Sequence, residues 1–135
     1  MNIFANSLGP AIPMPAKIFG WLLVLAGMFF AYVYMVTPGS FFSGIVIETL
    51  SEKFGLYSTG VRILGSVLGI AIALVLNSAA LLALMLATRA FIELGDVLVG
   101  LTVNGTPDAN TVTLTLLAAV EIYFVLKLSK LVRAR

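Results

Sequence analysis

Apolar runs of about 20 residues constrain the fold of this chain more than any other feature. Four such runs are separated by short polar or turn-forming segments. An α-helix needs about 20 apolar residues to cross the hydrocarbon core of a bilayer, and it bonds every backbone polar group within its own segment. We therefore predict an all-α fold, an integral membrane four-helix bundle. The expected spans are about residues 18–36, 58–76, 79–99 and 111–131.

Composition supports this membrane location. Apolar residues make up 61% of the chain and charged residues only 10%, whereas soluble proteins are roughly 45–50% apolar. So few charged side chains are not enough to cover a soluble globule. The 135 residues are short enough for one transmembrane domain.

The chain contains no cysteine and no histidine. Their absence excludes thiol nucleophiles and Ser–His–Asp sets, and it argues against haem, iron–sulfur and ordinary zinc sites. No phosphate-binding loop or dinucleotide fingerprint is found either. No cofactor is identifiable from these residues, and the sequence favours a non-enzymatic protein.

Basic residues predict the orientation in the membrane. Lys17 precedes the first run, while the opposite loops hold only Lys53 among lysines and arginines. Four more basic residues follow the middle of the last run: Lys127, Lys130, Arg133 and Arg135. By the positive-inside rule, both termini are expected in the cytoplasm, as in a bacterial inner-membrane protein. Because no aromatic-interleaved basic patch accompanies this tail, we expect no nucleic-acid partner.

The longest connection, residues 37–57, separates the first two runs. It combines apolar positions from Phe41 to Leu50 with Glu48, Glu52 and Lys53. This stretch is too short and too charged to span a bilayer. We expect a short interfacial helix there, with a re-entrant segment or a lid as the alternative.

The second and third runs are separated only by Asn77-Ser78, which predicts an antiparallel helical hairpin. Small residues recur along both arms of this hairpin: Gly65, Gly69 and Ala73 on one, and Ala83, Ala87 and Ala90 on the other. Such stripes allow helix backbones to approach closely within lipid. The two arms are expected to pack along them.

Apart from the basic end of the last run, five charged residues lie inside the apolar runs: Arg62, Arg89, Glu93, Asp96 and Glu121. Counting outward from the hairpin turn puts Arg62 level with Glu93, and a similar count puts Arg89 level with Glu121. We predict these two ion pairs, with Asp96 left without an assigned partner. Arg89 can instead pair with Glu93 within its own helix, four residues away.

We expect these five residues to form a buried polar cluster, which has two possible roles. Paired charges inside a bundle often only set helix register. Alternatively, two arginines against three acids leave one formal negative charge, which favours a bound proton, cation or polar ligand near Asp96 or Glu93. Asn77, Ser66 and Thr88 are expected to act as interhelical hydrogen-bonding groups.

Two short motifs carry a resemblance to a known family. Gly60-Val-Arg62-Ile-Leu-Gly65 opens the second run, and Gly95-Asp96 lies near the end of the third. Over roughly residues 57–131 the chain resembles small bacterial inner-membrane proteins of the DoxX-like type. The resemblance implies a four-helix bundle, and the association of its namesake with thiosulfate:quinone oxidoreductase implies quinone-linked redox chemistry. This chain lacks the cysteine or histidine that such chemistry would use.

Three functions remain open from the sequence. The leading expectation is a non-enzymatic accessory or assembly subunit, in a homo-oligomer or a larger membrane complex. A small-solute or proton-coupled transporter would use the five ionisable residues as its site. A quinone- or lipid-binding redox accessory protein is the third, with quinone or lipid as the bound molecule.

Overall fold

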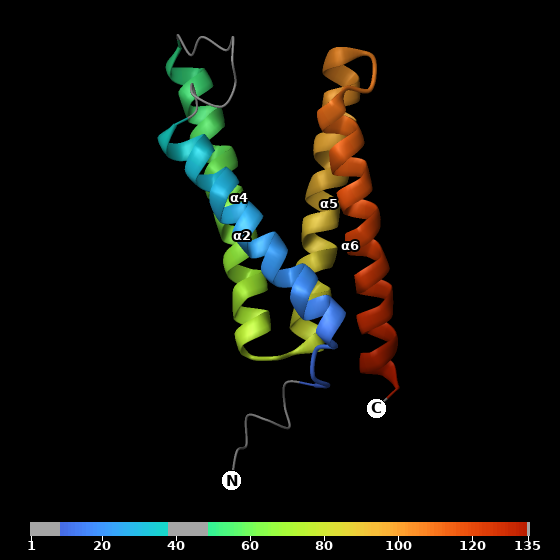
Figure 1. Ribbon diagram of the computed structural model, residues 1–135. Helices are drawn as coiled ribbons and strands as arrows, with labels where there is room; N and C mark the ends of the chain where they lie inside the picture. Colours follow the sequence, from blue (N-terminus) through green and yellow to red (C-terminus); the bar gives the residue numbers. More distant parts are fainter. Residues whose placement is uncertain (1–8, 38–48, 135) are drawn as a thin grey trace.

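The computed structural model describes residues 9–37 and 49–134, and this part of the chain contains four α-helices (Figure 1). They are α2 (Met14–Val36), α4 (Leu50–Val75), α5 (Ala79–Asn104) and α6 (Ala109–Arg133). Helices α2, α4 and α6 are long and apolar enough to cross a membrane. Helix α5 is equally long but carries three charged residues near its middle. The all-α prediction is confirmed, and the three apolar helices fit an integral membrane protein.

Successive helices run antiparallel and form two pairs. Helix α2 packs on α4, and α5 packs on α6, whereas α4 and α5 share a much smaller interface. Figure 1 shows that the two pairs meet near the α4–α5 turn and diverge toward the opposite end. The start of α2 and the end of α6 both lie at the end where the pairs meet.

The hydrophobic core lies where the pairs meet. Phe19 of α2 stacks on Phe124 of α6 with ring centroids 4.7 Å apart, so the first and last helices are in contact there. The buried core residues come from all four helices and the segment before α2: Ile12, Ala16, Leu23, Ile70, Ala73, Leu74, Ala79, Leu82, Ala83, Leu86 and Leu128. Packing of this core joins the two pairs at one end only.

Helices α2 and α4 approach each other closely. A Cβ atom added to Gly27 would overlap Val67, and one added to Gly60 would overlap Met35. The buried side of α2 is a row of small and apolar residues at spacings of three and four: Ala16, Gly20, Leu23, Gly27 and Ala31. The sequence analysis placed the close small-residue contact in the α4–α5 hairpin instead. The row in α2 has the spacing that would have identified this interface.

Helix α4 begins at Leu50 rather than near residue 58. Its N-cap residue is Thr49, whose hydroxyl accepts a hydrogen bond from the Glu52 backbone N–H, while the Glu52 carboxylate accepts one from the Thr49 N–H. This capping box satisfies two backbone donors and starts the helix early. The part of the expected interfacial helix from Leu50 onward therefore belongs to α4. The rest of that expected helix, in residues 38–48, lies outside the described residues.

The other helix ends also follow capping chemistry. Helix α2 starts at Met14 and has Pro15 in its first turn. Proline fits there because backbone N–H groups in a first turn have no partner within the helix, so no hydrogen bond is lost. Helix α5 continues to Gly105, whose φ of 71° ends it in the left-handed conformation that glycine adopts without strain. At the start of α6, the Thr111 hydroxyl and backbone N–H donate to Asp108, and these hydrogen bonds hold the pKa of Asp108 below its usual range.

The α4–α5 turn is fastened to the segment before α2. Asn77 has a φ of 50°, and its side-chain oxygen accepts a hydrogen bond of 3.2 Å from the Ile12 backbone N–H. The Ala79 N–H donates to the Pro10 carbonyl over 3.0 Å. Asn77 therefore links two segments 65 residues apart in the chain, close to the role in interhelical bonding that the sequence analysis gave it.

A buried charge cluster as the candidate functional site

The five ionisable residues predicted as a site lie together, and we call Arg62, Arg89, Glu93, Asp96 and Glu121 the charge cluster. Arg89 of α5 is its centre. Its Nε lies 2.7 Å from Glu121 of α6, and its Nη2 lies 2.9 Å from Glu93 one turn along α5. The predicted Arg89–Glu121 pair and its alternative, Arg89–Glu93, are thus both present.

The predicted Arg62–Glu93 pair is wrong. Arg62 of α4 instead donates to Asp96 of α5, with 3.0 Å between Nη2 and Oδ2. Asp96 therefore has a partner, contrary to the expectation that it lacked one. The count from the hairpin turn is nevertheless sound, since Ser66, which that count places level with Arg89, lies 3.5 Å from it.

Divergence of the helix pairs explains the change of partner. Because α4 moves away from α5 beyond the core, the long Arg62 side chain crosses the widening space and reaches Asp96, three residues farther from the turn than Glu93. The Glu93 carboxylate is instead held by Arg89. Counting residues outward from the turn assumes that the two helices stay side by side, so it does not account for their divergence.

The predicted helix-packing residues differ in burial. Ala73, Ala83 and Ala90 are buried, and a Cβ atom on Gly69 would overlap Met85 of α5. By contrast, Gly65 is exposed and has nothing within 4 Å of the position of an added Cβ. Ala87 is also exposed. The prediction that Gly65 and Ala87 pack in the hairpin is therefore wrong: Gly65 lies in open space, and Ala87 lines a groove toward α6.

Burial differs sharply across the charge cluster. The Glu121 side chain is 0% exposed and that of Glu93 is 6% exposed, whereas those of Arg62 and Asp96 are 46% and 36% exposed. The second carboxylate oxygens of Glu93 and Glu121 are buried without a hydrogen-bond partner. Two buried carboxylates thus share one guanidinium, and each keeps an unused acceptor.

Two further residues, which sequence reasoning did not place in the cluster, lie at its border. Ser66 donates to the Ile63 carbonyl and can accept from Arg89 of α5, in keeping with its expected interhelical role. The same expectation is wrong for Thr88, which donates to the Leu84 carbonyl within α5. The position of Ser66 four residues after Arg62, on the same helix face, was a usable signal. Tyr34 of α2 lies in the electrostatic field of Asp96 and Arg62. No local pattern indicated this, because α2 reaches the cluster only through the tertiary fold.

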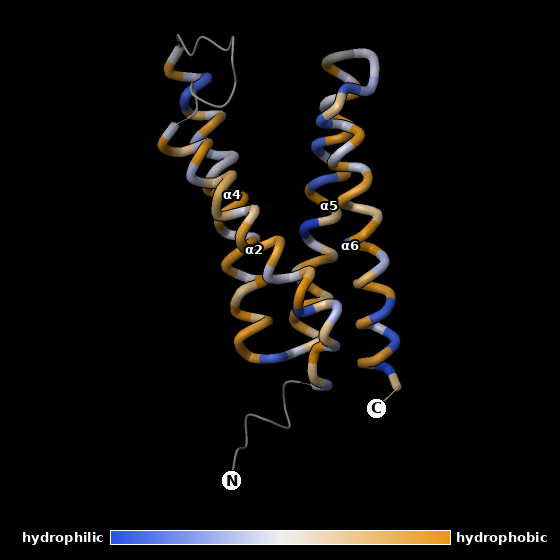
Figure 2. Tube along the Cα trace, viewed as in Figure 1, coloured by the Kyte–Doolittle hydropathy of each residue, from blue (hydrophilic) through white to orange (hydrophobic). Residues whose placement is uncertain are grey.

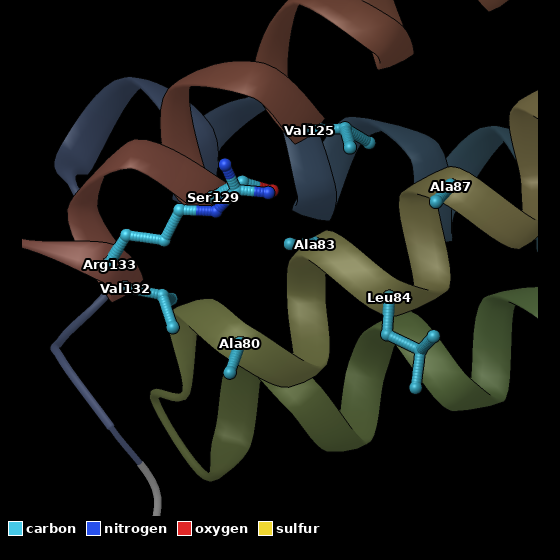
Figure 3. Close-up of a pocket in the computed structure, with 8 residues that line it drawn as sticks. All are labelled: Ala80, Ala83, Leu84, Ala87, Val125, Ser129, Val132 and Arg133. Atoms are coloured by element: carbon cyan, nitrogen blue, oxygen red, sulfur yellow. The ribbon is translucent and has the colours of Figure 1, made fainter.

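A separate groove lies between α5 and α6, near the end of α6 (Figure 3). Its volume is about 310 Å³, and the small side chains of α5 leave it open. In Figure 3 the Arg133 side chain extends along α6 to lie beside Ser129. The lining residues are Ala80, Ala83, Leu84, Ala87, Val125, Ser129, Val132 and Arg133. The groove is mostly apolar with one cationic side chain at its edge.

Hydrophilic segments are few along the helices. Figure 2 shows them at the start of α4, at the α4–α5 turn, in the middle of α5, near the α5–α6 connection and in the last turns of α6. Among residues 9–37 and 49–134, no group of three or more acidic, histidine or cysteine side chains is arranged to hold a metal ion. The charge cluster is therefore the main concentration of buried polar chemistry in the described chain.

Comparison with protein-family models, curated proteins and solved structures gives no match to this chain.

Proposed function

We propose that the protein is a non-enzymatic accessory or assembly subunit that crosses the membrane four times. Helix α5 would be the fourth span, since 26 residues extend over about 39 Å, more than the roughly 30 Å hydrocarbon core. Its three charged residues would not face lipid unpaired, because each has a partner within 3.0 Å. Pairing lowers the cost of charge at membrane depth.

The orientation follows from this four-span arrangement. With an even number of spans, the start of α2 and the end of α6 lie on one side of the bilayer. Lys17 and the basic end of α6 lie on that side, which the positive-inside rule assigns to the cytoplasm. We place the protein in a bacterial inner membrane, in keeping with the DoxX-like resemblance of its motifs.

The observation that carries the subunit proposal is the exposure of the Arg62–Asp96 ion pair. It joins α4 to α5 where the two helix pairs diverge, and its side chains are 46% and 36% exposed. An ion pair at membrane depth is costly to leave against lipid tails. A transmembrane helix of a partner subunit, with a polar side chain toward this pair, would cover it.

Single-cysteine crosslinking tests this proposal directly, because the natural chain contains no cysteine. Gly65→Cys introduces the thiol one turn from Arg62 in open space. Phe91→Cys is the matched control, since Phe91 lies at a similar depth in the hairpin and is 79% exposed. Each variant is crosslinked in native membranes, and adducts are identified by mass spectrometry.

We expect Gly65→Cys to form a defined protein adduct and Phe91→Cys to form none. The further change Arg62→Gln should reduce the adduct. An adduct between two copies of this chain would identify a homo-oligomer as the assembly. Absence of any protein adduct at residue 65, with both variants present in the membrane, would contradict the subunit proposal.

The α5–α6 groove favours a second candidate, a lipid- or quinone-binding accessory protein. Its apolar lining fits part of an acyl or isoprenoid chain, and Arg133 at its edge fits an anionic or carbonyl head group. Native mass spectrometry of the protein released from nanodiscs would test this. Retained lipid or quinone that is lost in Ala83→Phe would support it, and equal retention in that variant would exclude the groove.

A further inference from the structure

The α5–α6 half of the charge cluster contains more negative than positive charge. Glu93 and Glu121 each use one oxygen to bind Arg89, and the other oxygen of each is buried without a hydrogen-bond partner. Two carboxylates and one guanidinium give this group of three a formal charge of −1. Ionised carboxylates only accept hydrogen bonds, so neither can satisfy the other.

The surrounding elements supply no second positive charge to this group. From α4, Ser66 contributes a neutral hydroxyl, and Arg62 is bound to Asp96. From α5, Asp96 adds a further negative charge within electrostatic range of Glu93. From α2, Tyr34 is neutral and lies in the field of the Arg62–Asp96 pair. The imbalance at Glu93 and Glu121 therefore remains after every charged neighbour named here is counted.

We propose that Glu93 and Glu121 together bind one exchangeable proton. A single proton brings the group of three to neutrality and turns one of the two carboxylates into a hydrogen-bond donor. Paired carboxylates that share one proton are a known solution to the repulsion between adjacent acids. A hard metal cation is a poor alternative, because it takes on the order of six oxygen ligands and only two oxygens are unused here.

The carboxylates of the cluster also form a graded path from the surface inward. Asp96 is 36% exposed, Glu93 is 6% exposed and Glu121 is 0% exposed. Asp96 and Glu93 lie three residues apart on one face of α5, and Arg89 links Glu93 to Glu121 across to α6. This proposal goes beyond membrane assembly and does not require a partner subunit.

Infrared titration of the protein in phosphatidylcholine vesicles tests the proton site. The C=O stretch of a protonated carboxyl group reports proton uptake as the pH is lowered. We expect a band in the unaltered protein that is lost in both Glu93→Gln and Glu121→Gln, because either change leaves a single carboxylate against Arg89. Glu52→Gln is the matched control and should keep the band, since glutamine also serves the capping box of α4.

Selective labelling keeps the test decisive if a variant does not fold. When the glutamate side chains of a Glu48→Gln/Glu52→Gln protein, which keeps only Glu93 and Glu121, carry ¹³C at the carboxyl carbon, the band must shift to lower frequency. Replacing sodium by choline in the buffer should leave the titration unchanged. A band that does not shift on labelling, or one that persists in folded Glu93→Gln and Glu121→Gln, would overturn the proposal, as would its displacement by sodium.

Discussion

Arg89 of α5 holds the fully buried carboxylate of Glu121 on α6, with 2.7 Å between Nε and Oε1. This contact joins the last two helices beyond the hydrophobic core. The same guanidinium also binds Glu93, so one side chain compensates two buried charges. The stability of the α5–α6 pair should therefore depend on Arg89 more than on any other arginine of the cluster.

Replacing Arg89 tests that dependence. Arg89→Met leaves two buried carboxylates without their counter-charge and should lower the free energy of unfolding by about 3–5 kcal/mol. Arg62→Met is the control, and its loss should be smaller because the Arg62–Asp96 pair is partly exposed. Unfolding in mixed detergent micelles, followed by circular dichroism, measures both. Combining Arg89→Met with Glu121→Gln should recover part of the loss, and strictly additive losses would contradict coupling between the two residues.

Gly27 and Gly65 differ in their surroundings: Gly27 is closely packed, and Gly65 lies in open space. Gly27→Ala places a methyl group against Val67 of α4 and should destabilise the protein by about 1–3 kcal/mol through overpacking. Gly65→Ala meets no atom within 4 Å. Because alanine is a better helix former, that variant should be neutral or more stable by up to about 1 kcal/mol. Thermal unfolding of the two variants side by side checks this, and equal destabilisation would refute the α2–α4 interface described.

Asn77, in the α4–α5 turn, has a left-handed backbone conformation, and its side chain accepts a hydrogen bond from Ile12. Asn77→Gly keeps the left-handed conformation without strain and loses only the bond to the Ile12 N–H. Asn77→Ala loses both, so its melting temperature should be the lower of the two. The difference measures the backbone component, on the order of 1 kcal/mol. If the two variants melt together, the positive φ at this residue is not a constraint on stability.

Sequence reasoning reached the four long helices of the described residues, the hairpin turn and the Arg89–Glu121 contact. These features depend on local information. Apolar runs determine where helices form, and the number of residues on either side of a connection indicates which residues of two antiparallel helices lie at the same depth. It also placed all five charged residues in one cluster. Their positions within apolar runs made a paired cluster predictable, because unpaired charge is costly at membrane depth. The prediction that the whole cluster is buried is wrong for Arg62 and Asp96, whose side chains are 46% and 36% exposed.

Other features depend on how helices tilt against one another, which no local pattern reports. Arg62 pairs with Asp96 rather than with the predicted Glu93 because α4 and α5 diverge. Tyr34 lies near the charge cluster because α2 packs along α4. The early start of α4 was predictable in principle. Thr49 and Glu52 have the capping-box spacing, but the charge of Glu52 was interpreted as evidence for an interfacial segment.

The N-cap of α6 predicts a specific pH dependence. Hydrogen bonds from Thr111 lower the pKa of Asp108 in the folded protein. Its stabilising contribution is therefore complete above the unfolded value of about 3.9 and disappears as the pH falls through the folded value. Asp108→Asn retains a capping side chain that does not titrate. Amide hydrogen exchange at Val112 should accelerate in acid more in the unaltered protein than in this variant, and identical profiles would contradict the role of Asp108.

Asp96 lies three residues from Glu93 on α5 and within its electrostatic range, so we expect it to relay the exchangeable proton. Asp96→Asn removes the outermost carboxylate and should slow hydrogen–deuterium exchange at the buried carboxyl site, on the order of tenfold or more, while its infrared band remains. Arg62→Gln is the control, because it breaks the same ion pair but keeps the Asp96 carboxylate. Rapid-mixing infrared spectroscopy gives both rates. Slow exchange in both variants would indicate that the ion pair acts structurally, and unchanged exchange in Asp96→Asn would place the relay elsewhere.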